Sequence, residues 1–161
     1  MENAYIGLGS NLADPHAQVE AGIRALAQLR KTRLVARSCL YRSAAWGRVD
    51  QPEFINAAAA LETDLSPREL LDALLALERD AGRKRDGTRW GPRVLDLDIL
   101  LFGDRYIDEP GLHVPHPHLH QRAFVLVPLA EIAPDLVIAG HGRLADLLAC
   151  VDVSSCRRMP E

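Results

Sequence analysis

The sequence predicts an α+β sandwich with a βαββαβ core, in which helices pack on one face of an antiparallel-rich sheet. Strand-like and helical segments follow one another in that order over the first hundred residues. The chain has 161 residues, the length of one domain, and its 48% hydrophobic and 25% charged residues exclude disorder. We therefore expect a single domain over residues 1–161 that is ferredoxin-like in the broad sense and carries long mobile loops.

The N-terminal part is predicted to form a strand, a helix and a second strand. Ala4–Gly9 is an apolar run typical of a short buried strand. Asp14 and Pro15 supply the N-cap and the first-turn proline of a helix with apolar residues at helical spacing. Arg33–Tyr41 has the β-branched and aromatic content of a strand, and a long loop over 42–52 is expected to follow it.

The next three segments complete the predicted core. Phe54–Leu61 is expected to be a strand, although its run of four alanines would suit a helix equally well. Ser66 to Glu69 match a capping box with proline at the first helical position, and Gly82 ends the helix that begins there. Val94–Phe102 has the apolar content of the last core strand.

The remaining segments are predicted to be a hairpin, a loop, two helices and a tail. Gly103 and Asp104 mark a tight turn that would pair Arg105–Ile107 with the preceding strand. Three prolines make 110–117 a loop. Helices are expected over Gln121–Ile132 and Leu144–Leu148, and Ser154–Glu161 is expected to be frayed.

Two carboxylates in the last core strand are the first candidates for chemistry. Asp96 and Asp98 alternate along a strand, so they share a face, with Cα atoms about 6.6–6.8 Å apart. The apolar residues that alternate with them or follow them are predicted to face a core on the other side: Leu95, Leu97, Ile99 and Leu101. Adjacent anions repel each other unless a cation bridges them, and Mg²⁺ binds both carboxylates and phosphate oxygens. The alternative is an amphipathic edge strand with solvated aspartates.

A cationic segment precedes these carboxylates in the chain. Five basic residues and one acidic residue lie from Gly82 to Arg93, in a protein whose net charge is −3. Such a segment suits a compact polyanion such as a nucleotide better than a long nucleic acid, which needs a broad basic face. Its glycines could act as hinges of a mobile lid, with Trp90 stacked on a ring or sealing the site. The alternatives are a solvated loop of salt bridges and a tryptophan packed on the sheet.

Other metal and nucleotide signatures are incomplete. The glycine-rich segments match neither a P-loop nor a dinucleotide fingerprint. Prolines interrupt the alternating His116, His118 and His120, so we expect one of them to contact a phosphate instead of a zinc site. The three cysteines form no CxxC pair, which is typical of reduced thiols. No signal peptide and no run of the ~20 apolar residues that span a membrane is seen, so a cytoplasmic location is expected.

Several segments together resemble one enzyme family. Residues 89–100 read RWGPRVLDLDIL, and this segment resembles the signature of the 6-hydroxymethyl-7,8-dihydropterin pyrophosphokinases of folate biosynthesis. Segments 4–12, 51–57, 114–117 and 122–124 resemble the same family in order and spacing. The resemblance implies transfer of an intact pyrophosphoryl group from ATP to the pterin hydroxymethyl oxygen, with release of AMP.

The resemblance also implies roles for particular residues. Asp96 and Asp98 would hold two Mg²⁺ ions between the triphosphate and the substrate hydroxyl. Arg83 and Arg93 would stabilise the charge that develops during transfer. The residues implied to bind ATP are Glu78, Arg85, Arg89, Trp90, Arg93, Ile99, His116 and Arg122. Those implied to bind the pterin are Ser43, Ala44, Trp46, Phe54, Asn56, Trp90, Asp96 and Phe124. Of these, Phe54 and Phe124 would sandwich the flat ring.

The residues alone leave a second interpretation open. A non-catalytic ferredoxin-like module could bind an anionic metabolite through the basic loop, with Asp96 and Asp98 paired to arginines. Removing either carboxylate would weaken the binding of an ATP analogue to the enzyme, but would leave or strengthen its binding to such a module. In both cases we expect small-molecule ligands, no nucleic-acid or membrane partner, and a monomer.

Overall fold

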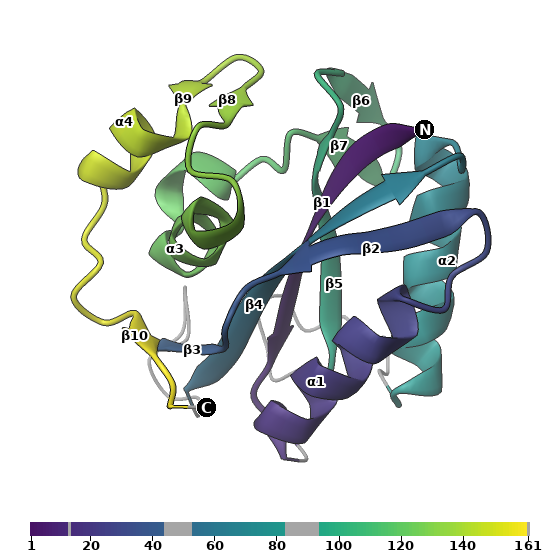
Figure 1. Cartoon of the computed structure of the whole chain (residues 1–161), viewed down its shortest axis with the longest axis horizontal. Coiled ribbons are helices and arrows are strands. Elements are labelled where there is room, and N and C mark those ends of the chain that lie inside the picture. The colour runs from purple at the N-terminus through teal and green to yellow at the C-terminus, as the bar shows by residue number, and fades with distance from the viewer. Residues whose placement is uncertain (13, 44–52, 83–93, 161) are drawn as a thin grey trace.

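The computed structural model describes residues 1–12, 14–43, 53–82 and 94–160, and its centre is one antiparallel sheet (Figure 1). Within these residues the sheet has six strands in the order β10-β3-β4-β1-β5, with β2 also paired to β4. The bounds are Glu2–Ser10 (β1), Thr32–Arg37 (β2), Tyr41–Ser43 (β3), Phe54–Thr63 (β4), Asp96–Phe102 (β5) and Arg157–Arg158 (β10). Because β1 pairs antiparallel with both β4 and β5, and β4 pairs with β2, the predicted βαββαβ core is confirmed.

Helices cover both faces of this sheet (Figure 1). Helices α1 (Pro15–Leu26) and α2 (Pro67–Asp80) enclose a first core on one face. Helix α3 (Ala123–Ile132) packs mainly on β4 from the opposite face, α4 (Leu144–Ala149) lies against α3, and a second core fills this layer. The two helices of the predicted βαββαβ core thus share one face, as expected, and α3 and α4 add a layer on the other face. Helix α3 is apolar on nearly every side, so it needs both the sheet and α4 to bury it.

Helices α1 and α2 begin where the sequence predicts, whereas α3 begins at Ala123 instead of Gln121. The Asp14 carboxylate accepts the N–H of Ala17 at the start of α1. At the start of α2 the Ser66 hydroxyl accepts the Glu69 N–H at 3.1 Å, and the Glu69 carboxylate accepts the Ser66 N–H at 2.9 Å. This reciprocal capping box satisfies two N–H groups that the helix itself leaves without partners. No helix within the described ranges is long and apolar enough to cross a membrane.

The Ser66→Ala substitution is expected to lower the free energy of unfolding by about 1 kcal/mol, because it removes the acceptor for the Glu69 N–H. Urea unfolding followed by circular dichroism measures this difference. Ser155→Ala is the matched control, because Ser155 is exposed in the C-terminal segment. Equal stability of the two variants would contradict a capping role.

A β-bulge divides β5 into two parts. The register of β1 with β5 shifts between Tyr5 and Ile6, so that Ile6 lies opposite Ile99 whereas Tyr5 lies opposite Leu101. The extra residue is Leu100, and both Leu100 and Leu101 pack into the second core. The prediction that Leu101 shares a face with Leu95, Leu97 and Ile99 was wrong, because the bulge reverses the alternation after Ile99.

The predicted hairpin after β5 was also wrong. Gly103 and Asp104 do form a turn, but Ile107–Glu109 (β6) pairs with Leu112–Val114 (β7) and not with β5. The N–H of Gly103 is instead bonded to the Asn3 carbonyl of β1. The true hairpin turn is Pro110-Gly111, in which Gly111 has a φ of 74°. Proline followed by glycine suits a type II turn, so part of 110–117 is strand and not loop.

The C-terminal segment is ordered against the sheet, which corrects the expectation of a frayed tail. Arg158 of β10 lies opposite Tyr41 of β3, and the Met159 N–H bonds to the Leu40 carbonyl. The predicted strand over 33–41 is in fact two strands, because both β2 and β3 pair with β4 and 38–40 lies between them. Strand β3 extends to Ser43, so the predicted loop begins later than expected.

The smaller elements complete the layer around α3. A 3₁₀ turn over Leu119–Gln121 leads into this helix. Strands Val137–Ile138 (β8) and Gly142–Arg143 (β9) form a second small hairpin before α4. Ile138 and Leu144 are buried in the second core, so this hairpin closes the outer side of the α3 layer.

Candidate active site

Three neighbouring strands bring polar side chains together at one end of the sheet. Asn56 of β4 lies opposite Gly9 of β1, which in turn lies opposite Asp96 of β5, and Asp98 follows two residues along. Directly opposite residues of antiparallel strands point to the same side of a sheet. Ala58, two residues after Asn56, is buried in the second core. The amide and both carboxylates therefore share the α3 face, as predicted for the two aspartates.

Glycine at position 9 keeps this surface open. A Cβ there would lie 3.0 Å from Oδ1 of Asn56 and 3.7 Å from Cδ1 of Phe54. A side chain at this position would therefore push the amide or the ring out of place. This role of Gly9 is not visible in the sequence, because only the strand register shows that Gly9 separates Asn56 from Asp96.

His116 faces Asp98 as a neutral hydrogen-bond donor. Its Nε2 lies 3.9 Å from Oδ2 of Asp98, and its Nδ1 accepts the backbone N–H of His118 at 3.3 Å. Burial lowers the pKa of His116 to about 4, and Arg122 acts in the same direction. A neutral imidazole whose Nδ1 is an acceptor carries its proton on Nε2. At neutral pH His116 thus presents an N–H group toward the carboxylate side of the site.

This low pKa makes stability depend on pH. The folded chain binds the His116 proton only near pH 4, whereas the ordinary value for the unfolded chain is 6.5. The contribution of the neutral imidazole to stability is therefore complete above pH 6.5 and is lost as the pH falls toward 4. The unfolding free energy of the unchanged protein should fall between about pH 7 and pH 5. We expect that of His116→Gln to fall by about 1–2 kcal/mol less over the same interval.

Urea unfolding at the two pH values measures this effect. His16→Gln is the control, because His16 lies on α1 and away from Asp98 and Arg122. An undiminished pH dependence in His116→Gln, or an equal reduction in the control, would contradict the assignment.

Arg122 is a buried cation beside the same carboxylates. It is the N-cap residue of α3 and is 9% exposed. Burial lowers the pKa of Arg122, whereas Asp98 and Asp96 raise it, and an arginine remains charged because its ordinary pKa is so high. Its guanidinium carbon lies 5.5 Å from the centre of the Phe124 ring. The site therefore holds a positive group that is already largely removed from water and can meet a phosphate.

A second polar pair lies next to the carboxylates. Nδ2 of Asn56 donates a hydrogen bond of 2.7 Å to Oγ of Ser43, and both residues are buried. Phe54 lies two residues before Asn56 on β4, and Phe124 lies in the first turn of α3. The structure thus brings an oriented amide and two half-buried aromatic rings to the same end of the sheet.

Two residues predicted to line a nucleotide pocket make other contacts. Glu78 of α2 is buried, and its Oε2 accepts the backbone N–H of Leu97 at 2.7 Å, between the two aspartates of β5. The side chain of Ile99 packs into the first core, which leaves its backbone for contact with a ligand. In the structure Glu78 therefore holds β5 itself.

The remaining predicted site residues lie outside the described ranges. They are Ala44, Trp46, Arg83, Arg85, Arg89, Trp90 and Arg93. Within the described ranges, no group of three or more histidine, cysteine, aspartate or glutamate residues is placed to hold a metal ion.

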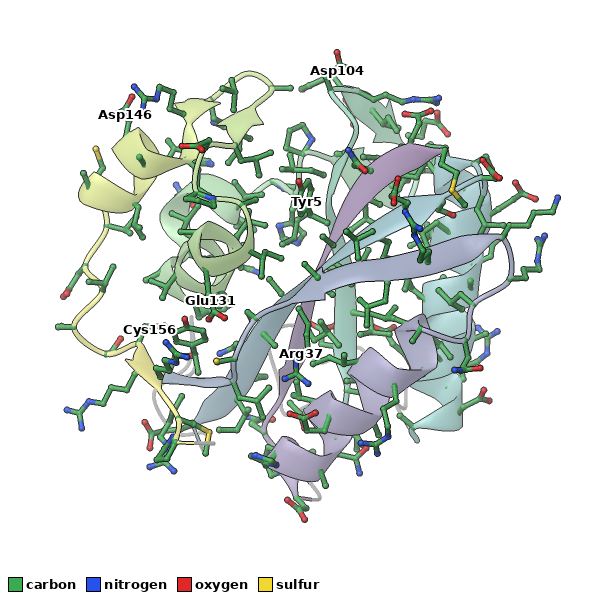
Figure 2. The ribbon with its side chains drawn as sticks, viewed as in Figure 1. Tyr5, Arg37, Asp104, Glu131, Asp146 and Cys156 are labelled. Atoms are coloured by element: carbon green, nitrogen blue, oxygen red, sulfur yellow. The ribbon has the colours of Figure 1, made fainter. Side chains whose placement is uncertain are left out.

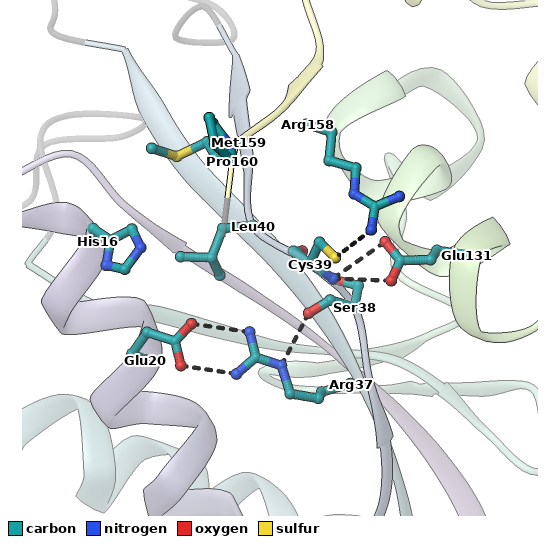
Figure 3. A pocket seen from close by; sticks show the side chains of 10 residues that line it. All are labelled: His16, Glu20, Arg37, Ser38, Cys39, Leu40, Glu131, Arg158, Met159 and Pro160. Carbon is teal, nitrogen blue, oxygen red and sulfur yellow. Dashed lines mark hydrogen bonds and ion pairs between the residues drawn. The ribbon is translucent and has the colours of Figure 1, made fainter.

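A cavity of about 690 Å³ lies away from this site (Figure 3). It is bordered by α1, the segment between β2 and β3, α3 and the chain after Arg157. Arg37 and Glu20 form a two-bond ion pair on one side of it, with N···O distances of 2.8 and 3.0 Å. None of the predicted site residues that the structure describes lines it.

The fold and the polar end of the sheet define a ferredoxin-like domain whose site combines carboxylates, a buried arginine and an oriented amide. Such a site suits a small phosphorylated or metal-bound ligand. Comparison with known proteins narrows this class. Residues 5–134 match the family model for 7,8-dihydro-6-hydroxymethylpterin-pyrophosphokinase (HPPK). The chain belongs to this family.

Curated relatives agree over nearly the whole chain. The 2-amino-4-hydroxy-6-hydroxymethyldihydropteridine pyrophosphokinase of Pseudomonas aeruginosa is 52% identical over 160 residues, covering 99% of this chain and 98% of the relative. The enzyme of the same name from Haemophilus influenzae is 48% identical, with 92% of each chain covered. The folate-pathway resemblance of the sequence is thereby confirmed.

Solved structures confirm the fold. The HPPK-DHPS protein of Plasmodium falciparum has a TM-score of 0.70 at 13% identity, over 93% of this chain. A second HPPK-DHPS structure, in complex with substrates, has a TM-score of 0.71 at 12% identity. The chain spans only 43% of the length of either protein, so the likeness concerns the HPPK-type fold.

Proposed function

We propose that the protein transfers the pyrophosphoryl group of ATP to the hydroxymethyl oxygen of 6-hydroxymethyl-7,8-dihydropterin in folate biosynthesis. That oxygen forms a bond to the β-phosphorus, the bond from the β-phosphorus to the α,β-bridging oxygen breaks, and AMP leaves while the hydroxyl proton passes to solvent. The observation that carries the proposal is the pair Asp96 and Asp98 beside Arg122 and His116, in a chain of this family.

Asp96 and Asp98 suit a magnesium site. Both offer hard oxygen donors on the same face of β5, and Mg²⁺ binds phosphates through one or two such carboxylates. We propose that the pair holds two Mg²⁺ ions, which neutralise phosphate charge when bound. Strand β5 is fixed on both edges here, by β1 on one side and by the Glu78 carboxylate on the other. The two donors are therefore held in place before the substrates bind.

Cationic residues would bind the triphosphate. Arg122 is buried and already charged, so it can attract a phosphate without first losing a full shell of water. His116 can donate its Nε2 proton to a phosphate oxygen while it remains neutral. The residues that the family resemblance adds from the basic segment are Arg83, Arg85, Arg89, Trp90 and Arg93. Of these, Arg83 and Arg93 are proposed to stabilise the charge that develops during transfer.

The pterin would bind at the end formed by β3 and β4. Asn56 is held by Ser43, so its remaining amide groups can meet the polar edge of the ring. Phe54 and Phe124 are proposed to stack on the two faces of the ring, which suits a flat aromatic ligand. Backbone groups near Ala44 and Trp46 would complete the contacts, and Glu78 and the backbone of Ile99 would border the adenosine.

Analysis of the nucleotide products tests this function. The purified protein is incubated with ATP and Mg²⁺, with and without 6-hydroxymethyl-7,8-dihydropterin, and the nucleotides are separated by chromatography. We expect AMP, formed only when the pterin is present. ADP would instead indicate transfer of a single phosphate. Binding of ATP without turnover would favour the non-catalytic module that binds an anion through its basic loop.

We further propose that the protein acts as a monomer in the cytoplasm, on these two small substrates, without a nucleic-acid or membrane partner. None of the three cysteines, all of which the structure describes, forms a disulfide, which suits a reducing compartment. Size-exclusion chromatography with light scattering tests the monomer, and a stable dimer would contradict it.

A further inference from the structure

Glu131, near the C-terminal end of α3, joins this helix to the chain that leads into β3. Figure 2 shows it at the end of α3 that faces this segment, and Figure 3 shows its carboxylate directed at Cys39. Its Oε1 and Oε2 accept the Cys39 N–H at 3.1 and 3.0 Å, and Oε1 also accepts the Tyr41 hydroxyl at 2.6 Å. One side chain therefore binds both the Cys39 N–H and the Tyr41 hydroxyl.

Strand β3 depends on such a contact because it is short. It has three residues, and its neighbours are the end of β4 and the two residues of β10. The backbone just before it lies in the gap between β2 and β3, where the Ser38 N–H bonds to Ala58 but the Cys39 N–H bonds to Glu131. The carboxylate thus takes the place of a strand partner at this gap.

Tyr41 remains a donor throughout the accessible pH range. Burial raises the pKa of Tyr41, and its hydrogen bond to Glu131 raises it further. Its ring is buried, so the hydroxyl position is fixed by packing as well as by this bond. The short bond between Tyr41 and Glu131 therefore fixes α3 relative to β3 by a partly buried link.

Helix α3 and strand β3 carry opposite walls of the proposed pterin site. Tyr41 lies opposite Asn56 in the register, and Ser43, two residues along β3, accepts the Asn56 amide. Phe124 precedes Glu131 by seven residues, two turns of α3, so it lies on the same side of the helix about 10 Å along its axis. A shift of α3 against β3 would change the distance between Phe124 and the Ser43–Asn56 pair.

We propose that Glu131 is a positioning residue for the pterin: by fixing α3 to β3 it sets the separation between Phe124 and the Ser43–Asn56 pair. This inference rests on the proposed function. The carboxylates on β5 are held by β1 and Glu78, whereas the hydrogen bonds of Glu131 go to Cys39 and Tyr41. Loss of Glu131 should therefore affect binding of the pterin much more than binding of ATP.

Steady-state kinetics of Glu131→Ala test the inference. We expect the KM for the pterin to rise about tenfold or more, since small displacements of positioning groups have effects of this size, while the KM for ATP changes by less than about twofold. Glu131→Gln keeps one acceptor oxygen, and Tyr41→Phe removes one of the bonds, so both should shift the pterin KM in the same direction by less. If Glu131→Ala does not fold, these two variants carry the test.

Glu20→Ala is the matched control, because Glu20 is also a carboxylate at the border of the cavity in Figure 3 but bonds to Arg37. It should leave both KM values unchanged. Equal shifts in the two KM values, a lower melting temperature with unchanged KM values, or a control that behaves like Glu131→Ala would overturn the inference. A wild-type protein that forms no AMP would instead overturn the proposed function.

Discussion

Asp98→Asn is expected to lower kcat/KM by about a thousandfold or more, because a neutral amide cannot replace a carboxylate as a ligand of Mg²⁺. Asp96→Asn should have an effect of similar size, since the two side chains share one face of β5. The fold should be retained, as asparagine has the same shape and the repulsion between the two anions is relieved. The rate of AMP formation at substrate concentrations well below KM measures the loss.

Calorimetric titration with a non-hydrolysable ATP analogue and Mg²⁺ separates the two interpretations of these carboxylates. The enzyme should lose about tenfold or more in affinity when either aspartate is replaced. A module that binds only an anion should bind as well or better, because a repelling charge has gone. Asp104→Asn, in the exposed turn after β5, is the control and should change neither measurement (Figure 2).

Arg122→Met is the second substitution with a large expected effect. Methionine fills a similar length but removes a buried positive charge that lowers the pKa of His116 and whose own pKa is raised by both aspartates. We expect kcat/KM to fall by about 100- to 1,000-fold, the size found when one preorganised charge is removed from a transferring site. The measurement is the rate of AMP release as a function of ATP concentration.

Two further variants define what Arg122 contributes. Arg122→Lys keeps the charge but loses the planar fork, so it should recover only part of the activity. Arg33→Met removes an exposed arginine that is paired with Glu62 on the sheet, and it should have no effect on turnover. Full activity of Arg122→Met would remove this residue from the proposed phosphate site.

The sequence predicted the core because local signals and long-range pattern agree there. Ser66 and Glu69 mark the start of α2, and Asp96 and Asp98 share a face because β5 is regular up to Ile99. The family resemblance supplied the remaining candidate residues. Where the structure describes these residues, it brings Asn56, Asp96 and Asp98 to one end of the sheet.

The predictions were wrong where contacts with residues far away in the sequence determine the local structure. Pairing of Arg158 with Tyr41 orders a segment that has no pattern of its own. Gly103 and Asp104 look like a hairpin turn, but the Gly103 N–H bonds to Asn3 of β1 and the hairpin forms at Pro110-Gly111 instead. The bulge at Leu100 was equally invisible, since a run of apolar residues does not show which face each of them occupies.

That bulge marks the position at which β5 tolerates a change of length. Upstream of it Asp96 and Asp98 face α3, and downstream Phe102 returns to the first core because Leu100 adds one residue. Deleting Leu100 would leave a regular β5 in which Asp96 and Asp98 still face α3 and Phe102 still faces the first core, because Ile99 and Leu101 already lie opposite neighbouring residues of β1. Such a deletion would cost only the contacts of Leu100 in the second core, whereas deleting a residue between Asp96 and Ile99 would turn part of the strand to the wrong face.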